Sequence, residues 1–335
     1  MKPGILLIGA FLLFVFGLVA CGNGIGNGSP RTVASGLSTP YNIAVNDTDV
    51  YWTEYGTGYL GNVKKIKKNN GSITTLASDM CAPFGIALDS SNVYFTTANC
   101  GSPAGAPLSS TIAGVYKVAL NSGPTITLAS DGYLTWGVIV DSDNVYWQGG
   151  ASGANYIKKV LINNGTVTTI ATNPDIGPYG IAVDETAVYW LSTGYTGTYA
   201  VPGAVWKQLK SESTATTIAV EQGLSVRYMM IDSSDVYFAT SEYTGTGYNG
   251  SIRKVSKNGG QVTILASNID NPSGIALDST NIYWTASYGG VIQTTLKSGG
   301  AVTTLASGRT MPGSVAVDST SVYWIEGNSI KKIAK

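Results

Sequence analysis

Apolar and polar residues follow one another in the same order at seven places along the chain. Each copy has a short apolar stretch, then an Asp or Asn among small polar residues, then an apolar segment ending in Tyr-Trp or Tyr-Phe, as in residues 275–284 (IALDSTNIYW). The apolar segments have the length of β-strands, and the polar residues between them are typical of tight turns. Successive copies lie 43, 52, 43, 48, 46 and 40 residues apart, counted from their Asx residues: Asn46, Asp89, Asp141, Asp184, Asp232, Asp278 and Asp318.

Each repeat contains two further segments that are predicted to be strands. In the first repeat these are a lysine-bearing segment at residues 62–68 and a segment at residues 72–76, separated by an Asn-Asn-Gly turn. Four antiparallel strands in every ~45 residues predict an all-β fold, a β-propeller in which each repeat forms one blade. Because the repeated Asp stands at the head of a turn, we expect it to cap the turn rather than to bind a metal.

The two ends of the chain complement each other. A fourth-strand motif such as TTLAS (residues 74–78) occurs six times, whereas the chain ends at Lys335 just after the third strand of the last repeat. A similar segment, TVASG (residues 32–36), precedes the first repeat. We therefore predict a seven-bladed β-propeller over residues 31–335, closed by N-terminal strand exchange with residues 329–335 so that no sheet edge stays open. A linear solenoid is the alternative, but it gives the matching ends no role.

The first thirty residues precede the repeats. Lys2 and the apolar run from Ile5 to Ala20 predict a secretory signal peptide over residues 1–20. The sequence Leu-Val-Ala-Cys at residues 18–21 resembles the bacterial lipobox, which implies lipidation at Cys21, and Gly22 resembles lipoproteins sent on to the outer membrane. Residues 21–30 are expected to form a flexible linker. We predict a protein of the bacterial cell envelope anchored to the membrane by lipid; an ordinary signal peptide or an uncleaved anchor is the alternative.

Composition excludes several classes of function. The chain contains no histidine, which removes imidazole bases, Ser-His-Asp triads, His-ligated zinc and Cys-x-x-Cys-His haem sites. Without residues 1–20 it carries 19 basic and 20 acidic side chains, so nothing indicates nucleic acid as a partner. We expect no cofactor, no metal and no haem. Cys81 and Cys100, both near the second repeat, are predicted to form a disulfide.

Strings such as Val-Tyr-Trp-Thr-Glu (residues 50–54) and Ile-Tyr-Trp-Thr-Ala (residues 282–286) resemble the YWTD repeats of lipoprotein-receptor propellers and the related NHL repeats of bacterial exported proteins. The resemblance covers residues 31–335 and implies a binding scaffold as often as an enzyme. It departs from the YWTD pattern in having seven repeats rather than six blades, and Glu54 or Ala286 where the motif has Asp. Virginiamycin-lyase-like propellers are also similar in outline, but they depend on a catalytic histidine that this chain lacks.

Two groups of residues are candidates for a ligand site. The first stands five residues before each Asx position, at the start of the innermost strand, where it should surround the mouth of the central channel: Tyr41, Phe84, Trp136, Tyr179, Arg227, Ser273 and Gly313. This arc is expected to form either a ligand cup or a hydrophobic plug. The second group consists of tyrosines on glycine-rich loops, which either stack against a ligand or pack over their own loops: Tyr195, Tyr199, Tyr243 and Tyr248, with a similar pair at Tyr55 and Tyr59.

A binding or interaction scaffold for an envelope protein or a glycan is the function that these features favour. No set of residues combines a nucleophile, a base and an orienting group, so no catalytic residue is assigned. The alternatives are a carbohydrate-active enzyme, a lyase or glycosidase using Glu54, Glu242 or Glu326, and a structural or adhesive surface protein. On the loop-bearing face, acids should outnumber bases and favour a cationic ligand: Glu54, Asp79, Asp131, Asp175, Glu221, Glu242, Asp270 and Glu326 against Arg227 and Arg309.

Overall fold

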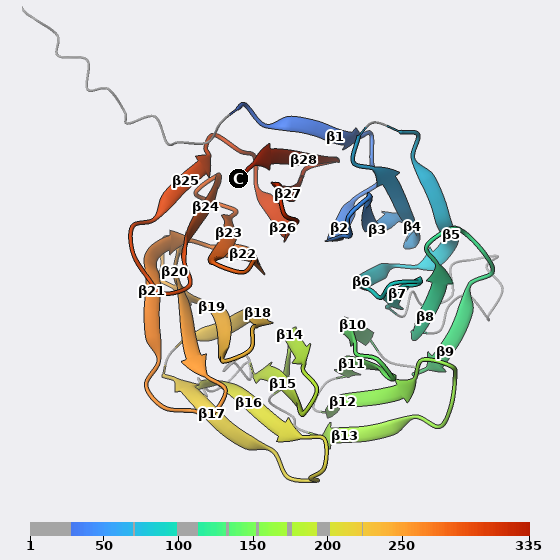
Figure 1. Ribbon diagram of the computed structural model, residues 1–335, viewed down its shortest axis with the longest axis horizontal. Helices are drawn as coiled ribbons and strands as arrows, with labels where there is room; N and C mark the ends of the chain where they lie inside the picture. Colours follow the sequence, from blue (N-terminus) through green and yellow to red (C-terminus); the bar gives the residue numbers. More distant parts are fainter. Residues whose placement is uncertain are drawn as a thin grey trace, which may run out of the picture.

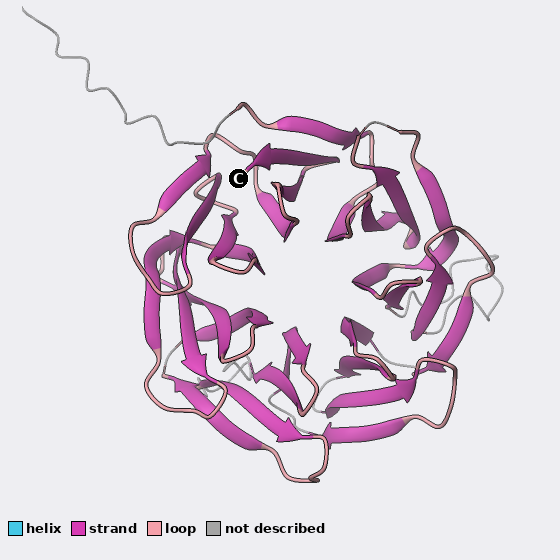
Figure 2. Ribbon diagram, viewed as in Figure 1, coloured by secondary structure: helices cyan, strands magenta, loops and turns pink. Residues whose placement is uncertain are grey.

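The computed structural model describes residues 28–69, 71–98, 113–131, 134–151, 154–172, 176–192, 202–222 and 224–335. Every regular element within these residues is a β-strand, and none of them belongs to a helix long and apolar enough to cross a membrane. The strands form seven four-stranded antiparallel sheets, arranged as blades around a central axis (Figures 1 and 2). The predicted seven-bladed propeller is therefore confirmed.

Six blades consist of four consecutive strands. The first three are β2 to β5 (Pro40–Val45, Asp49–Thr57, Leu60–Lys67, Thr74–Cys81), β6 to β9 (Pro83–Leu88, Asn92–Thr97, Gly114–Ala119, Ile126–Ser130) and β10 to β13 (Leu134–Val140, Asn144–Ala151, Ala154–Leu161, Thr168–Thr172). The next three are β14 to β17 (Ile176–Val183, Ala187–Ser192, Gly203–Leu209, Thr216–Glu221), β18 to β21 (Ser225–Ile231, Asp235–Tyr243, Tyr248–Ser256, Thr263–Asp270) and β22 to β25 (Pro272–Leu277, Asn281–Ala286, Val291–Leu296, Thr303–Ala306).

Blade seven joins the two ends of the chain. It contains β26 (Pro312–Val317), β27 (Ser321–Glu326) and β28 (Ser329–Ala334), and its outermost strand is β1 (Arg31–Ser35). Strand β1 runs antiparallel to β28, with Arg31 opposite Lys332 and Ser35 opposite Ser329. Figure 1 shows β1 lying along β28 beside the C-terminus. Closure by N-terminal strand exchange is thus confirmed.

The second strand of each blade supplies most of the core. In β3, Val50, Tyr51 and Trp52 are all at most 1% exposed. Tyr51 packs in a cluster with Val93 and Phe95 of blade two, whereas Trp52 packs with residues of blade seven. The strand is apolar on both faces because each blade lies between two others. Burying one large apolar side chain of this kind stabilises the fold by about 1.5–3 kcal/mol.

The repeated Asp residues cap the turns between the first and second strands, as expected. In blade six the Asp278 Oδ1 atom accepts hydrogen bonds from the backbone N–H groups of Thr280 (2.9 Å) and Asn281 (2.7 Å). Its Oδ2 atom accepts from the Tyr283 hydroxyl (2.8 Å) and from Lys335 Nζ of blade seven (2.6 Å). The carboxylate therefore serves two purposes, since it holds its own turn and ties its blade to the next one.

This lysine contact recurs around the ring. Five ion pairs among the described residues each join the Asp of one blade to the residue after the third strand of the following blade: Lys68–Asp318, Lys210–Asp141, Lys257–Asp184, Lys297–Asp232 and Lys335–Asp278. At the two remaining junctions, which follow the blades of Asn46 and Asp89, the residues at the lysine position are Leu120 and Ile162. We call the side of the propeller that carries these pairs the turn face, and the opposite side the loop face.

Stability is expected to depend on these carboxyls at low pH. Partial burial alone would raise the pKa of Asp184, Asp232, Asp278 and Asp318, but hydrogen bonds from lysine and backbone N–H groups hold it well below its usual value. Because the folded-state pKa is depressed, this stabilisation is present above the unfolded value of about 4 and is lost as pH falls through the folded pKa. Urea unfolding followed by circular dichroism should show falling stability below about pH 4. A urea midpoint that stayed the same between pH 6 and pH 2 would contradict the stabilising role given to these Asp–Lys pairs.

Candidate functional site

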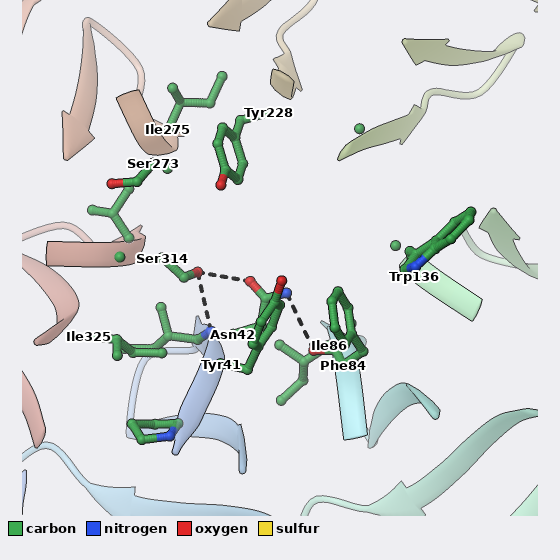
Figure 3. Close-up of a pocket in the computed structure, with 18 of the residues that line it drawn as sticks. Tyr41, Asn42, Phe84, Ile86, Trp136, Tyr228, Ser273, Ile275, Ser314 and Ile325 are labelled. Atoms are coloured by element: carbon green, nitrogen blue, oxygen red, sulfur yellow. Dashed lines mark hydrogen bonds between the residues drawn. The ribbon is translucent and has the colours of Figure 1, made fainter. Parts of the chain in front are cut away.

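A cavity of about 520 Å³ lies at the loop-face mouth of the central channel (Figure 3). Its wall is built from the beginnings of the innermost strands, including β2, β6, β10, β18, β22 and β26. In each of these strands the pairing register with the second strand shifts near this point, for example between Pro40 and Ile43 and between Pro83 and Ile86. Such bulges re-aim side chains away from the regular strand alternation, so they place one or more side chains of each strand at the channel mouth.

Aromatic side chains line one side of the cavity. The rings of Tyr41 and Phe84 have centroids 3.9 Å apart with an interplanar angle of 38°, and Trp136 follows on the next blade (Figure 3). Tyr41 remains 40% exposed. The structure therefore brings these three predicted residues together around one cavity.

A hydrogen-bonded amide holds this aromatic arc in place. The Ser314 hydroxyl donates to Asn42 Oδ1 (2.9 Å), and Asn42 Nδ2 donates to the backbone oxygen of Phe84 (3.3 Å), as Figure 3 shows. These bonds join blades seven, one and two. Asn42 was not among the residues predicted from the sequence, because a polar residue at the start of a strand belongs to no pattern that marks its role.

The other side of the cavity is lined by small and flexible residues. Ser273 and Gly313 lie there as predicted, together with Met311, which is 63% exposed. The Ser273 hydroxyl donates to the backbone oxygen of Pro312 (2.6 Å), and the Thr285 hydroxyl donates to that of Gly313 (2.7 Å). These bonds join blades six and seven on this side of the cavity.

At blade five the expectation was wrong, because Tyr228 rather than Arg227 lines the cavity. The register of β18 with β19 shifts between Arg227 and Met229, and Tyr228 at this shift has a φ of 48°. The irregularity turns Tyr228 toward the middle of the cavity (Figure 3). Repeat alignment assumes the same geometry in each blade, so it missed a shift of one residue. The side chain of Tyr179 lies outside the described part of β14.

None of the described residues that line the cavity carries a charge. The lining offers aromatic faces, the hydroxyls of Tyr41, Tyr228, Ser273 and Ser314, and the amide of Asn42. Such a surface stacks against flat or weakly polar groups and exchanges neutral hydrogen bonds with them. No carboxylate, amine or guanidinium stands among the described lining residues.

Four of the eight acids expected on the loop face, Glu54, Asp131, Glu221 and Glu326, are engaged in ion pairs. Glu54 is fully buried, and its carboxylate accepts hydrogen bonds from Trp52 Nε1 and Lys64 Nζ, both at 2.9 Å. Asp131 binds Trp147 and Lys158 in the same way, and Glu221 pairs with Arg253. The expected excess of negative charge is therefore wrong for these residues, because their partners Lys64, Lys158 and Arg253 come from third strands and were not counted among the bases of the loop face.

Two of the three carboxylates considered for glycoside hydrolysis are also engaged in such contacts. Glu326 accepts from Trp324 Nε1 (3.0 Å) and lies 3.8 Å from the Arg309 guanidinium. Glu54 is bound as described above, which leaves Glu242, an exposed residue near the end of β19. Two free carboxylates facing each other are needed for that chemistry, and Glu54, Glu242 and Glu326 do not supply them.

Exposed tyrosines gather on the loop face of blades five and six. The ring centroids of Tyr243 and Tyr248 are 5.3 Å apart, and Tyr248 lies 5.8 Å from Tyr288 of blade six. Tyr243 is 65% exposed although its hydroxyl donates to the backbone oxygen of Gly245 (2.9 Å). Tyr288 was not predicted. It precedes Gly289 and Gly290, so it stands on a glycine-rich loop like the predicted tyrosines, and this feature of the sequence could have identified it. Tyr195 and Tyr199 lie outside the described residues.

The remaining sequence predictions concern cysteines and metals. Cys81 is buried at the end of β5, but Cys100 lies outside the described residues, so their disulfide stays a prediction. Cys21 and the rest of residues 1–27 also lie outside them. Among the residues that are described, no cluster of three or more Cys, Asp or Glu side chains is suited to a metal ion.

Comparison with solved structures finds the same architecture at low identity. A streptogramin B lyase aligns with a TM-score of 0.68 and 13% identity over 91% of this chain and 96% of that chain. The chain is a seven-bladed β-propeller. A catalytically inactive His-to-Ala variant of virginiamycin B lyase from Staphylococcus aureus, with quinupristin, gives 0.66 and 13% over 92% and 98%. Kuenenia stuttgartiensis hydrazine synthase gives 0.68 and 13% over 91% and 98%.

These likenesses show the propeller fold alone, since the identities are low and the neighbouring proteins differ in function. No family model matches the chain, and no curated protein matches it. Membership in the YWTD or NHL repeat families therefore stays a prediction.

Proposed function

We propose that the protein is a binding scaffold that holds a neutral glycan in the aromatic cavity on its loop face. The observation that carries this proposal is the lining itself: partly exposed aromatic rings opposite hydroxyl and amide groups, with no charge among the described lining residues. The cavity volume of about 520 Å³ lies in the range of small-ligand sites, roughly 300–1,000 Å³. Sugar rings stack on aromatic faces and exchange hydrogen bonds with neutral polar groups.

Binding is favoured over catalysis by the state of the ionisable groups. The loop-face carboxylates of Glu54, Asp131 and Glu326 already accept hydrogen bonds from indole N–H groups and lie next to cations. The chain has no histidine, whereas the histidine variant of virginiamycin B lyase is described as catalytically inactive. The shared fold therefore does not extend the lyase reaction to this chain.

The same proposal includes an anchor in the bacterial envelope. The lipobox-like residues 18–21 support lipidation at Cys21, and the glycine-rich residues that follow support a flexible tether. A propeller attached in this way would bind its glycan, or an envelope protein that carries one, near the membrane surface.

Trp136→Ala is expected to weaken binding of the best ligand from a panel of envelope glycans by at least about 1–2 kcal/mol, because a central aromatic anchor would be removed. Arg227→Ala is the matched control, since Arg227 belongs to the same strand position in blade five but does not line the cavity. Affinity is measured by calorimetry and folding by thermal melting. If Trp136→Ala lowered only the melting temperature, the arc would be structural, and the tyrosines of blades five and six would become the site. If the propeller bound an envelope protein that carries no glycan, the proposed ligand class would also be overturned.

A further inference from the structure

We propose that the protein binds a phosphate group in a second, basic pocket on the turn face, at the seam where β1 closes the ring. The pocket measures about 230 Å³, and its lining includes Arg31, Thr32, Lys67, Lys68, Asn69 and Lys332. Its residues come from the end of β4, from the connection that follows it and from the paired ends of β1 and β28. It lies on the opposite face from the aromatic cavity and does not depend on the function proposed for that cavity.

Blade seven departs from the other blades at this point. Across the third and fourth strands, Arg31 stands directly opposite Lys332. In the other six blades the residue at the position of Arg31 is Thr or Ile: Thr74, Ile126, Thr168, Thr216, Thr263 and Thr303. Like charges directly opposite each other destabilise a ladder. A bound anion would offset this repulsion, which no other blade contains.

Three of the four cations that line the pocket have no carboxylate partner within the described part of the chain. Of the ion pairs found among the described residues, none includes Arg31, Lys67 or Lys332. Lys332 Nζ donates to the backbone oxygen of Lys68 (3.0 Å), which concentrates positive charge further. Lys67 stands across the β3–β4 ladder from the buried Asp49 without forming an ion pair.

Lys68 is the one lining cation with a carboxylate partner, Asp318. That carboxylate also accepts hydrogen bonds from the backbone N–H groups of Thr320 and Ser321 and from the Tyr323 hydroxyl. Its charge is therefore used within blade seven, and the pocket keeps the charges of Arg31, Lys67 and Lys332. Guanidinium and ammonium groups are the usual partners of phosphate oxygens, and the Thr32 hydroxyl and Asn69 amide add neutral donors.

The phosphate has two possible sources. The chain leaves β1 toward Cys21 through residues 21–30, a segment that spans at most about 35 Å. If Cys21 is acylated as predicted, phospholipid headgroups lie within reach of the pocket. Free phosphate or a phosphorylated metabolite is the other source, and it requires no membrane.

The first test measures binding of inorganic phosphate by calorimetry to the chain from residue 21 onward carrying Cys21→Ser, which contains every described residue. The double variant R31Q/K67Q should bind at least about tenfold more weakly, since two charge-assisted contacts are removed. The matched control is K159Q/K254Q, which removes two charges at the positions equivalent to Lys332 in blades three and five. Equal affinity in the two double variants, or no saturable binding by the unaltered chain, would overturn the proposal.

A second measurement separates the site from general charge effects and identifies the source. Arg31 and Lys67 are exposed, so R31Q/K67Q should fold, and phosphate should raise the melting temperature of the unaltered chain but not that of this variant. Co-sedimentation then compares vesicles of phosphatidylcholine with vesicles that also contain phosphatidylglycerol. Recruitment to the anionic vesicles that is lost in R31Q/K67Q assigns the site to a headgroup; phosphate binding without recruitment assigns it to a soluble ligand. Absence of both overturns the site.

Discussion

Deleting residues 31–36 should lower the free energy of unfolding by at least about 3 kcal/mol, although these residues are farthest in sequence from the strand they pair with. Ala34 is buried, and Val33 packs against a cluster that includes Ile325 and Ile330 of blade seven. Losing an apolar side chain of the size of Val removes roughly 1.5 kcal/mol or more, and each ladder hydrogen bond contributes about 0.5–1.5 kcal/mol. Urea unfolding at neutral pH measures the change.

The same deletion should also promote association between molecules. Removing β1 leaves β28 as an open edge with unpaired backbone groups, and such edges pair with other chains. Size-exclusion chromatography should show oligomers that the full chain does not form. Deleting residues 22–27, which precede all described residues, is the matched control and should leave both melting and size unchanged. A deletion of residues 31–36 that melted like the full chain would show that ring closure contributes little.

Replacing Asp232 by alanine should destabilise the protein by about 2–4 kcal/mol, because one carboxylate supports both a turn and a contact between blades. Its Oδ1 atom accepts from the backbone N–H groups of Ser234 (3.0 Å) and Asp235 (2.9 Å), and its Oδ2 atom accepts from Tyr237 (3.0 Å) and Lys297 (2.9 Å). Chemical unfolding compares the variant with the unaltered chain.

Blade one provides the matched substitutions for this experiment. There Asn46 Oδ1 accepts from the backbone N–H groups of Thr48 (3.0 Å) and Asp49 (2.9 Å), and the lysine position of the following blade is Leu120. Asp232→Asn should therefore keep the turn and lose only the ion pair. Adding Lys297→Leu to Asp232→Asn should cost less than Lys297→Leu alone, since the lysine has then lost its partner. Additive losses would show that the pair contributes nothing beyond its separate residues.

Ion pairs inside the blades explain why the charge of the loop face was harder to predict than the fold. Lys64 and Lys158 lie on third strands and were not counted among the bases of the loop face, yet they form ion pairs with Glu54 and Asp131. The aromatic residue of the second strand takes part as well, because its indole N–H is buried and needs an acceptor. Counting the charged residues of one face could not show that acids and bases meet inside the blades.

Four features could be predicted from the sequence: the number of blades, the order of strands, the closure by the N-terminal strand and the capping role of the repeated Asp. These features follow from local alternation and from turn chemistry within about ten residues, which repeat in every blade. Tertiary structure alone decided that Tyr228 replaces Arg227 at the cavity, that lysines join neighbouring blades and that Arg31 meets Lys332 at the seam. The physical reason is that bulges and contacts between sheets depend on how far apart two backbones lie, and neither periodicity nor composition records that distance.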